Sequence, residues 1–330
     1  MIANQWYAVL SSKELKKKRL LGVTRFGEKL VFWRKKDGMI GCIADKCCHR
    51  GASLCTGKLV GGKVQCPFHG FEYDVTGKVD FIPANGKASP VPENFHVRSY
   101  PVQEKGGFVF VWYGDPAKMT PEIPFFEDLL QGFHYAESKE VWGVHYTRAI
   151  ENQLDVVHLP FVHRTTIGRG GKTVVNGPLV TWENNRMTYY VDDVLDQGQK
   201  PLAAKDVPDF DKKYSLQFQM PNLWQNRIAP KIRVMAAFAP IDDEHTMIYI
   251  RFYQKVLPTP ILGSLMVHLG NTADRVILHQ DRRVVLTQLP KKSELQMGEN
   301  LVQGDAPIIA YRMKRDQLKK ENDQPKPAVK

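Results

Sequence analysis

The chain has 330 residues, of which 43% are hydrophobic and 25% charged, as in a soluble globular protein long enough for two domains. No apolar run reaches the roughly 18–20 residues that a membrane-spanning helix needs, so no membrane association is expected. The five cysteines are an odd number and the first residues lack the pattern of a signal peptide. These features predict a reducing, cytoplasmic setting and argue against a disulfide framework.

The net charge of +11 permits nucleic-acid binding without indicating it. Basic residues cluster at 16–19, at 34–36 and in the tail from Arg312, and none of these clusters follows a nucleic-acid motif with interleaved aromatic residues. We interpret them as solvated surface, with a docking face for an acidic electron-donor protein as the alternative. A nucleic-acid partner is not expected.

Residues 1–115 are predicted to form a β-rich domain. Short strand-like runs occur at 29–33, 39–43 and 107–113, and the first two are joined by a turn containing Asp37-Gly38. The Pro-containing stretch that follows reads as a connection, so residues 116–330 are predicted to form a second domain.

Between these strands lie two pairs of potential metal ligands, Cys47/His49 and Cys66/His69. Two thiolates and two imidazoles can hold tetrahedral zinc or a [2Fe–2S] cluster with two Cys on one iron and two His on the other. Each Cys here travels with a His, whereas zinc fingers usually keep their His pair together on a helix. Each pair also runs into a glycine, which allows the backbone to turn tightly. The spacing favours the cluster and leaves zinc as the alternative.

A second group of polar residues follows a predicted helix that begins near residue 146. Asn152, Asp155 and His158 recur every three residues, so they would drift slowly around one helical face. His163 lies five residues after His158, which on an ideal helix is about 140° away from it. We expect Pro160 to interrupt the helix and bring the two histidines together at one metal.

A third ligand is predicted in the helical stretch 271–288. Asp281 falls in its apolar stripe, where a carboxylate needs a cation or good hydrogen bonds. Asp274 and His279 are expected to point elsewhere, Asp274 to solvent. His158, His163 and Asp281 would form a 2-His-1-carboxylate triad, which leaves positions open on an iron.

Strand-rich sequence separates the two helical regions. Several runs alternate with period two, as expected for an antiparallel sheet solvated on one side, and a long helix over such a sheet would enclose a pocket. The runs lie at 179–182, 187–191, 214–220, 232–238 and 247–253. Trp224, Asn226, Phe238 and Phe252 are expected to pack the core, and Arg148, Arg227 and Arg233 to lie at the surface.

The two constellations, in this order and at this separation, resemble the oxygenase (alpha) component of Rieske non-heme iron oxygenases over nearly the whole chain. Ala52 and Phe68 stand where respiratory Rieske proteins have an extra disulfide, so the resemblance is to the oxygenase type. Cys48 departs from the proline usual in the family. The resemblance implies an α+β fold: an N-terminal all-β Rieske [2Fe–2S] domain followed by a helix-grip catalytic domain, an antiparallel sheet with a long helix.

The resemblance also implies the cofactors and their ligands. Cys47, His49, Cys66 and His69 would hold the [2Fe–2S] cluster, and His158, His163 and Asp281 a mononuclear Fe(II). In a head-to-tail homotrimer Asp155 would bridge His158 to a cluster histidine of the neighbouring chain, for which His69 is the candidate. Asn152 matches a polar position near the iron. A ferredoxin or an NAD(P)H-dependent reductase would supply the electrons.

The short chain looks like the branch of vanillate O-demethylase and dicamba monooxygenase. Membership there implies hydroxylation, or O- or N-demethylation, of a small aromatic or methylated substrate with O2. Cis-dihydroxylation of an aromatic ring is the alternative, followed by a Rieske electron-transfer protein and a zinc-binding interaction protein. The last two would not require the 158/163/281 set.

Overall fold

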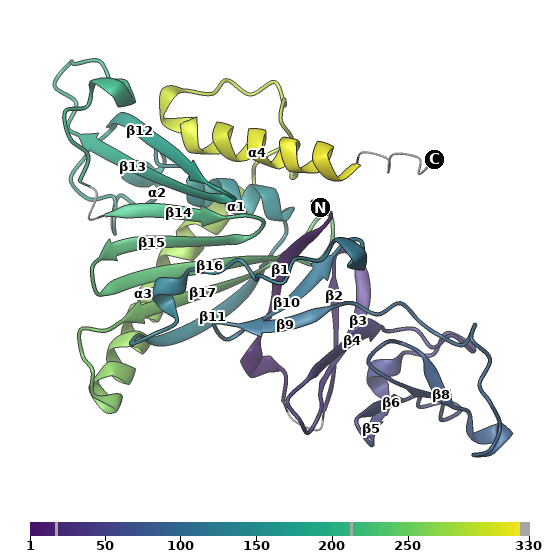
Figure 1. Cartoon of the computed structure of the whole chain (residues 1–330). Coiled ribbons are helices and arrows are strands. Elements are labelled where there is room, and N and C mark those ends of the chain that lie inside the picture. The colour runs from purple at the N-terminus through teal and green to yellow at the C-terminus, as the bar shows by residue number, and fades with distance from the viewer. Residues whose placement is uncertain (17–18, 212–213, 324–330) are drawn as a thin grey trace. The chain divides into compact units, whose positions relative to one another are not determined.

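The computed structural model describes residues 1–16, 19–211 and 214–323 (Figure 1). The chain divides into two compact units, the first containing Ala3–Ile123 and the second beginning at Pro124. Lys17, Lys18 and the end of the basic tail lie outside the described residues. Within the described residues, no helix combines the length and apolarity required to cross a membrane.

The first unit is built from three small antiparallel sheets and short 3-10 turns. One sheet has the order β1 (Gln5–Ser11), β10 (Phe108–Tyr113), β9 (Val102–Lys105), and another the order β2 (Leu20–Arg25), β3 (Glu28–Arg34), β4 (Ile40–Ala44). The third has the order β5 (Lys58–Val60), β6 (Lys63–Gln65), β7 (Glu72–Tyr73), β8 (Val79–Phe81). The 3-10 turns are η1 (Ser12–Glu14), η2 (Leu54–Thr56), η3 (Pro83–Asn85) and η4 (Pro116–Lys118).

The strands expected at 29–33, 39–43 and 107–113 are present as β3, β4 and β10. Sequence reasoning missed β1, in which every residue after Gln5 is buried and the polar–apolar alternation of a half-exposed strand is therefore absent. A hydrophobic cluster beneath the third sheet includes Cys47 and Cys66, which are only 3% exposed.

The second unit is one seven-stranded antiparallel sheet with helices against it (Figure 1). Its order is β11 (His134–Trp142), β17 (Thr246–Gln254), β16 (Ile232–Pro240), β15 (Leu223–Ala229), β14 (Ser215–Gln219), β13 (Arg186–Val194), β12 (Val174–Glu183). The helices are α1 (Tyr146–Leu154), α2 (Leu159–Val162), α3 (Pro260–Val285) and α4 (Ala306–Asp323), with the 3-10 turns η5 (Glu127–Leu129), η6 (Ala204–Asp206) and η7 (Gln303–Asp305). The long helix α3 crosses one face of the sheet and packs on β11 and β17, and α4 packs on β12.

Two expectations about this unit need correction. The helix expected at 271–288 begins earlier, at Pro260, because proline is well tolerated in a first helical turn. The expected solvated face is wrong for β16, in which every residue after Ile232 is buried. Helix α1 packs against β16, so this strand has no free face.

Arg148 is also buried, at 3% exposure, and not at the surface as expected. It lies 3.2 Å from Glu151 and 2.8 Å from Glu299, and Arg312 of α4 lies 2.7 Å from the same two carboxylates. Each of the two arginines contacts both glutamates, and this pairing compensates for the burial of the guanidinium groups. They join α4 to α1, the helix that carries Asn152. Arg233 is likewise buried, 3.4 Å from Asp128.

Candidate metal centres and substrate cavity

Helix α1 ends before the residues that were expected to continue it. His145 caps its start by accepting from the Thr147 N–H, and Leu154 is its last residue. Asp155 is extended, with φ −72° and ψ 125°, and its Oδ1 accepts from the backbone N–H groups of Val157 at 2.7 Å and His158 at 3.1 Å. This side-chain turn changes the chain direction. The expected shared helical face of residues 152, 155 and 158 is therefore wrong.

Pro160 has a different role from the one expected. It lies within the first turn of α2, where a missing N–H costs nothing. The end of α1, at Leu154, lies before it in the chain. The short helix α2 places His158 and His163 at its two ends, and the His163 N–H donates to the Leu159 carbonyl. The two rings end 5.0 Å apart between centroids.

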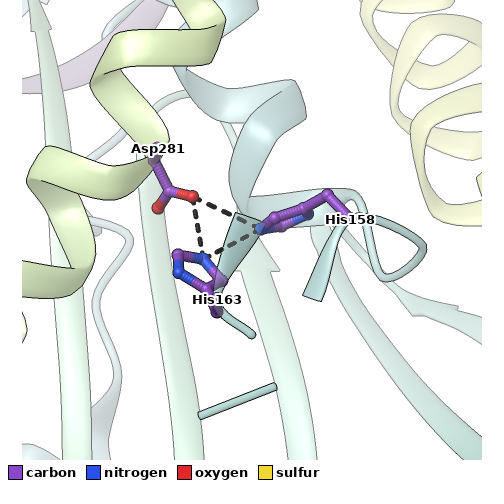
Figure 2. A group of neighbouring side chains, drawn as sticks. All are labelled: His158, His163 and Asp281. Atoms are coloured by element: carbon purple, nitrogen blue, oxygen red, sulfur yellow. Dashed lines mark hydrogen bonds and ion pairs between the residues drawn. The ribbon is translucent and has the colours of Figure 1, made fainter. Parts of the chain in front are cut away.

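His158, His163 and Asp281 meet at one point beneath α3 (Figure 2). Asp281 Oδ1 lies 2.9 Å from His163 Nε2 and 3.4 Å from His158 Nε2, and the two Nε2 atoms are 3.2 Å apart. Asp281 is 3% exposed and His163 1%. The sequence-derived triad is thus brought together from a loop, a helix end and a second helix 118 residues further along the chain (281 − 163 = 118).

The separations fit a shared metal ion. Ligand atoms about 2.1 Å from a metal are about 3.0 Å apart at right angles and about 3.4 Å apart in a tetrahedron. The three measured separations, 2.9, 3.2 and 3.4 Å, lie within about 0.1 Å of this range. Asp281 Oδ1 is buried and accepts no hydrogen bond, and His158 Nδ1, which lies 3.5 Å from Asp155 Oδ1, has no hydrogen-bond partner. A bound cation would satisfy the carboxylate oxygen, which is costly to leave unpaired.

The charges of His158 and Asp281 support one another. Burial would lower the pKa of His158, but its contacts with Asp155 and Asp281 raise it to about 9. Burial would raise the pKa of Asp281, but the two histidines hold it below its usual value. The carboxylate is therefore ionised, as a metal ligand must be, and a metal ion that binds there would displace the proton that these contacts hold on His158.

Gln280 is a residue that sequence reasoning missed. Its Oε1 lies 2.8 Å from His163 Nδ1 and accepts at 2.8 Å from the Thr166 hydroxyl. Because this oxygen can only accept, it fixes the proton on Nδ1 and leaves the Nε2 lone pair for the metal. The sequence feature that could have identified Gln280 is its position directly before Asp281, which puts it on the neighbouring face of α3.

A cavity of about 330 Å³ opens beside the triad, between α3 and the inner face of the sheet. Every second residue of β15 lines it, namely Trp224, Asn226 and Ile228, as expected for one face of a strand. Trp224 and Asn226 thus face the cavity, which corrects their assignment to core packing. The remaining lining residues are Asn152, Gln153, Asp155, Val156, His158, Leu159, His163, Ile167, Val191, Asp193, Leu216, Val234, Ile250, Asp274, Ile277, Leu278 and Asp281.

Two other helical residues were assigned by the same reasoning. His279 does point away from the triad and lies 2.8 Å from Glu140, with a half-exposed side chain. Asp274 was expected in solvent but is 7% exposed and lines the cavity. It lies seven residues before Asp281, and seven helical residues complete nearly two turns, so both share one face of α3.

In the first unit, the two Cys/His loops have the same backbone frame. The N–H of Cys47 donates to the Ala52 carbonyl at 2.8 Å and that of Cys66 to the Phe71 carbonyl at 2.8 Å. Gly51 and Gly70 return hydrogen bonds to the same two cysteines, and their φ angles of 74° and 75° favour glycine. Each cysteine is buried, whereas His49 is exposed and His69 half-buried.

Aromatic side chains surround these loops. The Tyr73 hydroxyl donates to Cys47 Sγ at 3.0 Å and accepts from the Cys48 N–H at 3.0 Å. Burial and the contacts with the Cys47 and Cys48 side chains raise the pKa of Tyr73 well above its usual value, so the hydroxyl keeps its proton. The His49 ring stacks on Phe71 at 4.9 Å and lies 4.6 Å from the His69 ring. Two buried sulfurs and two outward imidazoles fit a [2Fe–2S] cluster with chemically different irons.

Taken together, the fold and these side chains are those of a metalloprotein with one metal centre in each unit. Comparison with known families makes the class specific. Residues 5–101 match the Rieske [2Fe-2S] domain, and residues 142–321 match the vanillate O-demethylase oxygenase C-terminal domain. The chain therefore belongs to the Rieske oxygenases, as an oxygenase (alpha) component of the vanillate O-demethylase type, and the expected α+β fold is confirmed.

Individual relatives agree with this assignment. The chain is 38% identical over 172 residues to chlorophyllide a oxygenase of Chlamydomonas reinhardtii, which is 51% of this chain and 26% of that protein. It is 35% identical over 169 residues to the dicamba O-demethylase oxygenase component of Stenotrophomonas maltophilia, 49% of this chain and 48% of that protein. The matched part of each relative is thus less than two thirds of its length.

Solved structures share the fold over both units. NdmA of Pseudomonas putida CBB5 superposes with a TM-score of 0.79 at 22% identity, covering 96% of this chain and 90% of that one. The cofactors of the family are a Rieske [2Fe–2S] cluster and a mononuclear iron, as expected, and the zinc alternative is set aside.

Proposed function

We propose that this chain is a terminal oxygenase that uses O2 and externally supplied electrons to oxidise a small organic substrate. The convergence of His158, His163 and Asp281 on one point at the wall of a cavity is the observation that carries the proposal. An electron carrier with no oxygen chemistry would need only the first unit.

The three converging residues are proposed to hold the mononuclear iron. Iron bound there would supply the activation of O2 for oxidation of a substrate C–H bond. The protein side chains prepare the site for it. Gln280 keeps the His163 proton on Nδ1, Asp155 fixes the loop before His158, and the apolar cavity wall limits water around the substrate. Asn152 lines the cavity and is proposed to contact the substrate.

Cys47, Cys66, His49 and His69 are proposed as ligands of the cluster. The exposed side of this site presents His49 and the 57% exposed Phe68, whose ring lies 5.6 Å from the Arg50 guanidinium. We propose that a ferredoxin or NAD(P)H-dependent reductase supplies the electrons. In a homotrimer, Asp155 would link His158 to a cluster histidine of the neighbouring chain.

The proposed reaction is hydroxylation, or O- or N-demethylation, of the substrate. The dicamba O-demethylase name of one relative supports this reaction type, and the volume of the cavity limits the substrate. An apolar cavity of about 150 Å³ can hold one benzene, so about 330 Å³ suits a substituted single ring. All five cysteines are free of disulfides, which supports a reducing, cytoplasmic setting.

The test is EPR spectroscopy of the anaerobically purified, reduced protein before and after exposure to nitric oxide. We expect a Rieske-type signal together with a high-spin iron–nitrosyl signal. The second signal should disappear in Asp281→Ala and persist in Asp243→Asn, a change at an exposed residue. A Rieske signal alone, in wild-type protein replete with iron, would overturn the oxygenase proposal in favour of an electron carrier.

A further inference from the structure

The substrate cavity contains polar atoms that nothing in the protein satisfies. Asp274 Oδ2, Asp193 Oδ1 and Asn152 Nδ2 are buried and have no hydrogen-bond partner, and all three residues line the cavity. Buried carboxylate oxygens without partners are rare because their desolvation is not compensated. Two such oxygens and one unpartnered amide nitrogen around one cavity indicate that its occupant supplies the partners.

Within the described residues, no neighbouring cation offsets the effect of burial on the pKa of these two carboxyl groups. Burial is what raises the pKa of Asp274, to about 7. Burial also raises the pKa of Asp193, to about 6, against a lowering contribution from Lys172. A cation that entered the cavity would stabilise both ionised forms, whereas a second anion would oppose them.

The rest of the lining reinforces this preference. No lysine or arginine of the described part of the chain is among the residues that line the cavity. An anionic head group would therefore find no positive partner other than the metal site itself. The remaining walls are mainly aliphatic, with Trp224 as the one aromatic side chain, and they suit an apolar frame.

The position of Asp274 defines where the complementary group of the substrate lies. Asp274 and Asp281 are seven residues apart on α3, which corresponds to about 10 Å along the helix on one face. Ile277 and Leu278 lie between them and also line the cavity. A substrate whose reactive carbon lies near the triad would span an apolar stretch about as wide as one ring before it meets Asp274.

We propose that the substrate is an apolar molecule with a basic nitrogen, whose ammonium group binds Asp274 one ring width from the carbon that reacts, while Asp193 adds to the negative charge of the cavity. This inference rests on the proposed function, which identifies the end of the substrate near the triad as the end that reacts. The binding of the amine depends only on the cavity, so it can be tested without turnover.

The experiment is calorimetric titration of the anaerobic full-length holoprotein with three probes that share one frame. The probes are 4-methoxybenzylamine, 4-methoxybenzyl alcohol and 4-methoxybenzoate, which differ in the charge of one group. We expect the amine to bind at least about tenfold more tightly than the benzoate, the difference that a charge-assisted hydrogen bond supplies. Asp274→Asn should weaken amine binding about tenfold and leave alcohol binding unchanged, and Asp243→Asn should change neither.

Other results would overturn the inference. These are benzoate binding as tight as that of the amine, equal weakening of amine and alcohol in Asp274→Asn, or no amine binding at millimolar concentration. Asp193→Asn provides a second variant on the opposite wall, should Asp274→Asn not fold. If wild-type protein gave no iron–nitrosyl signal, the proposed function would be wrong, but the amine titration would still test the cavity. The two failures are therefore distinguishable.

Discussion

Tyr73 is expected to set part of the reduction potential of the cluster. Its hydroxyl donates to Cys47 Sγ at 3.0 Å, and reduction makes that sulfur more electron-rich, so the hydrogen bond favours the reduced state. A hydrogen bond to a charged group contributes about 1.5–3 kcal/mol, and we assign about 1 kcal/mol of it to the difference between oxidation states. For one electron this equals about 40 mV. Tyr73→Phe should therefore lower the potential by about 40 mV.

The assay is a redox titration of the holoprotein followed by circular dichroism or EPR. Tyr100→Phe is a matched control, because Tyr100 is another buried tyrosine of the first unit and its hydroxyl donates to Glu28 instead. An unchanged potential in Tyr73→Phe, or an equal shift in Tyr100→Phe, would refute the reasoning. Retained cluster absorbance in both variants shows that the comparison concerns potential and not cluster loss.

Three further predictions concern the second unit. Gln280→Leu removes the acceptor for His163 Nδ1 and should weaken Fe(II) binding to the apoprotein by about 10–100-fold in a metal titration. Glu151→Gln leaves two buried guanidinium groups underpaired and should lower the free energy of unfolding in urea by about 3 kcal/mol. Asp274→Asn should stabilise the protein by about 4 kcal/mol at pH 8 and little at pH 4, measured by urea unfolding.

The sign of the Asp274 effect follows from its raised pKa. Below its usual pKa of 3.8 the group is protonated in both the folded and the unfolded state. As pH rises to about 7, the unfolded state gains the favourable ionisation first, so the wild type loses stability that the Asn variant keeps. Equal stability of the two proteins at pH 8 would show that water or an ion satisfies the carboxylate.

The other two variants have their own controls. Gln288→Leu changes an exposed glutamine beyond the end of α3, and its iron affinity should match the wild type. Glu183→Gln changes an exposed carboxylate of β12 and should leave the urea midpoint in place. If Glu151→Gln lost no more stability than Glu183→Gln, the buried charge network would not stabilise the docking of α4.

The proposed metal ligands stand out in the sequence because their signals are local. The Cys47/His49 and Cys66/His69 spacings specify two similar loops, and a carboxylate at position 281 stands out in an apolar helical stripe. Asp274 was misassigned because it was placed outside the apolar stripe that holds Asp281, whereas a helix beside a cavity presents a wider face. The period-two rule would have placed Trp224 and Asn226 on one face of a strand, but β15 itself was not recognised.

Features that depend on distant partners could not be predicted from local patterns. Arg148 looks like a surface residue until Glu299, 151 residues further along the chain, completes its ion pairs. The end of α1 at Leu154 was also not predictable from the local pattern, because the helical spacing of the polar residues continues past it. There, the Asp155 side chain offers the backbone N–H groups a turn in place of the next helical hydrogen bonds.

The two units distribute burial in opposite ways around their proposed metal ligands, and this bears on what would have to reach each centre. In the first unit the sulfurs are buried and His49 faces solvent, so an electron donor needs only to approach the surface. In the second, His163 and Asp281 are nearly inaccessible, and the exposed lining residues Ile167 and Ile228 mark the mouth of the cavity. A substrate must therefore shed water before it meets the triad, and Asp193 and Asp274 can replace that water only for a molecule that donates hydrogen bonds or carries positive charge.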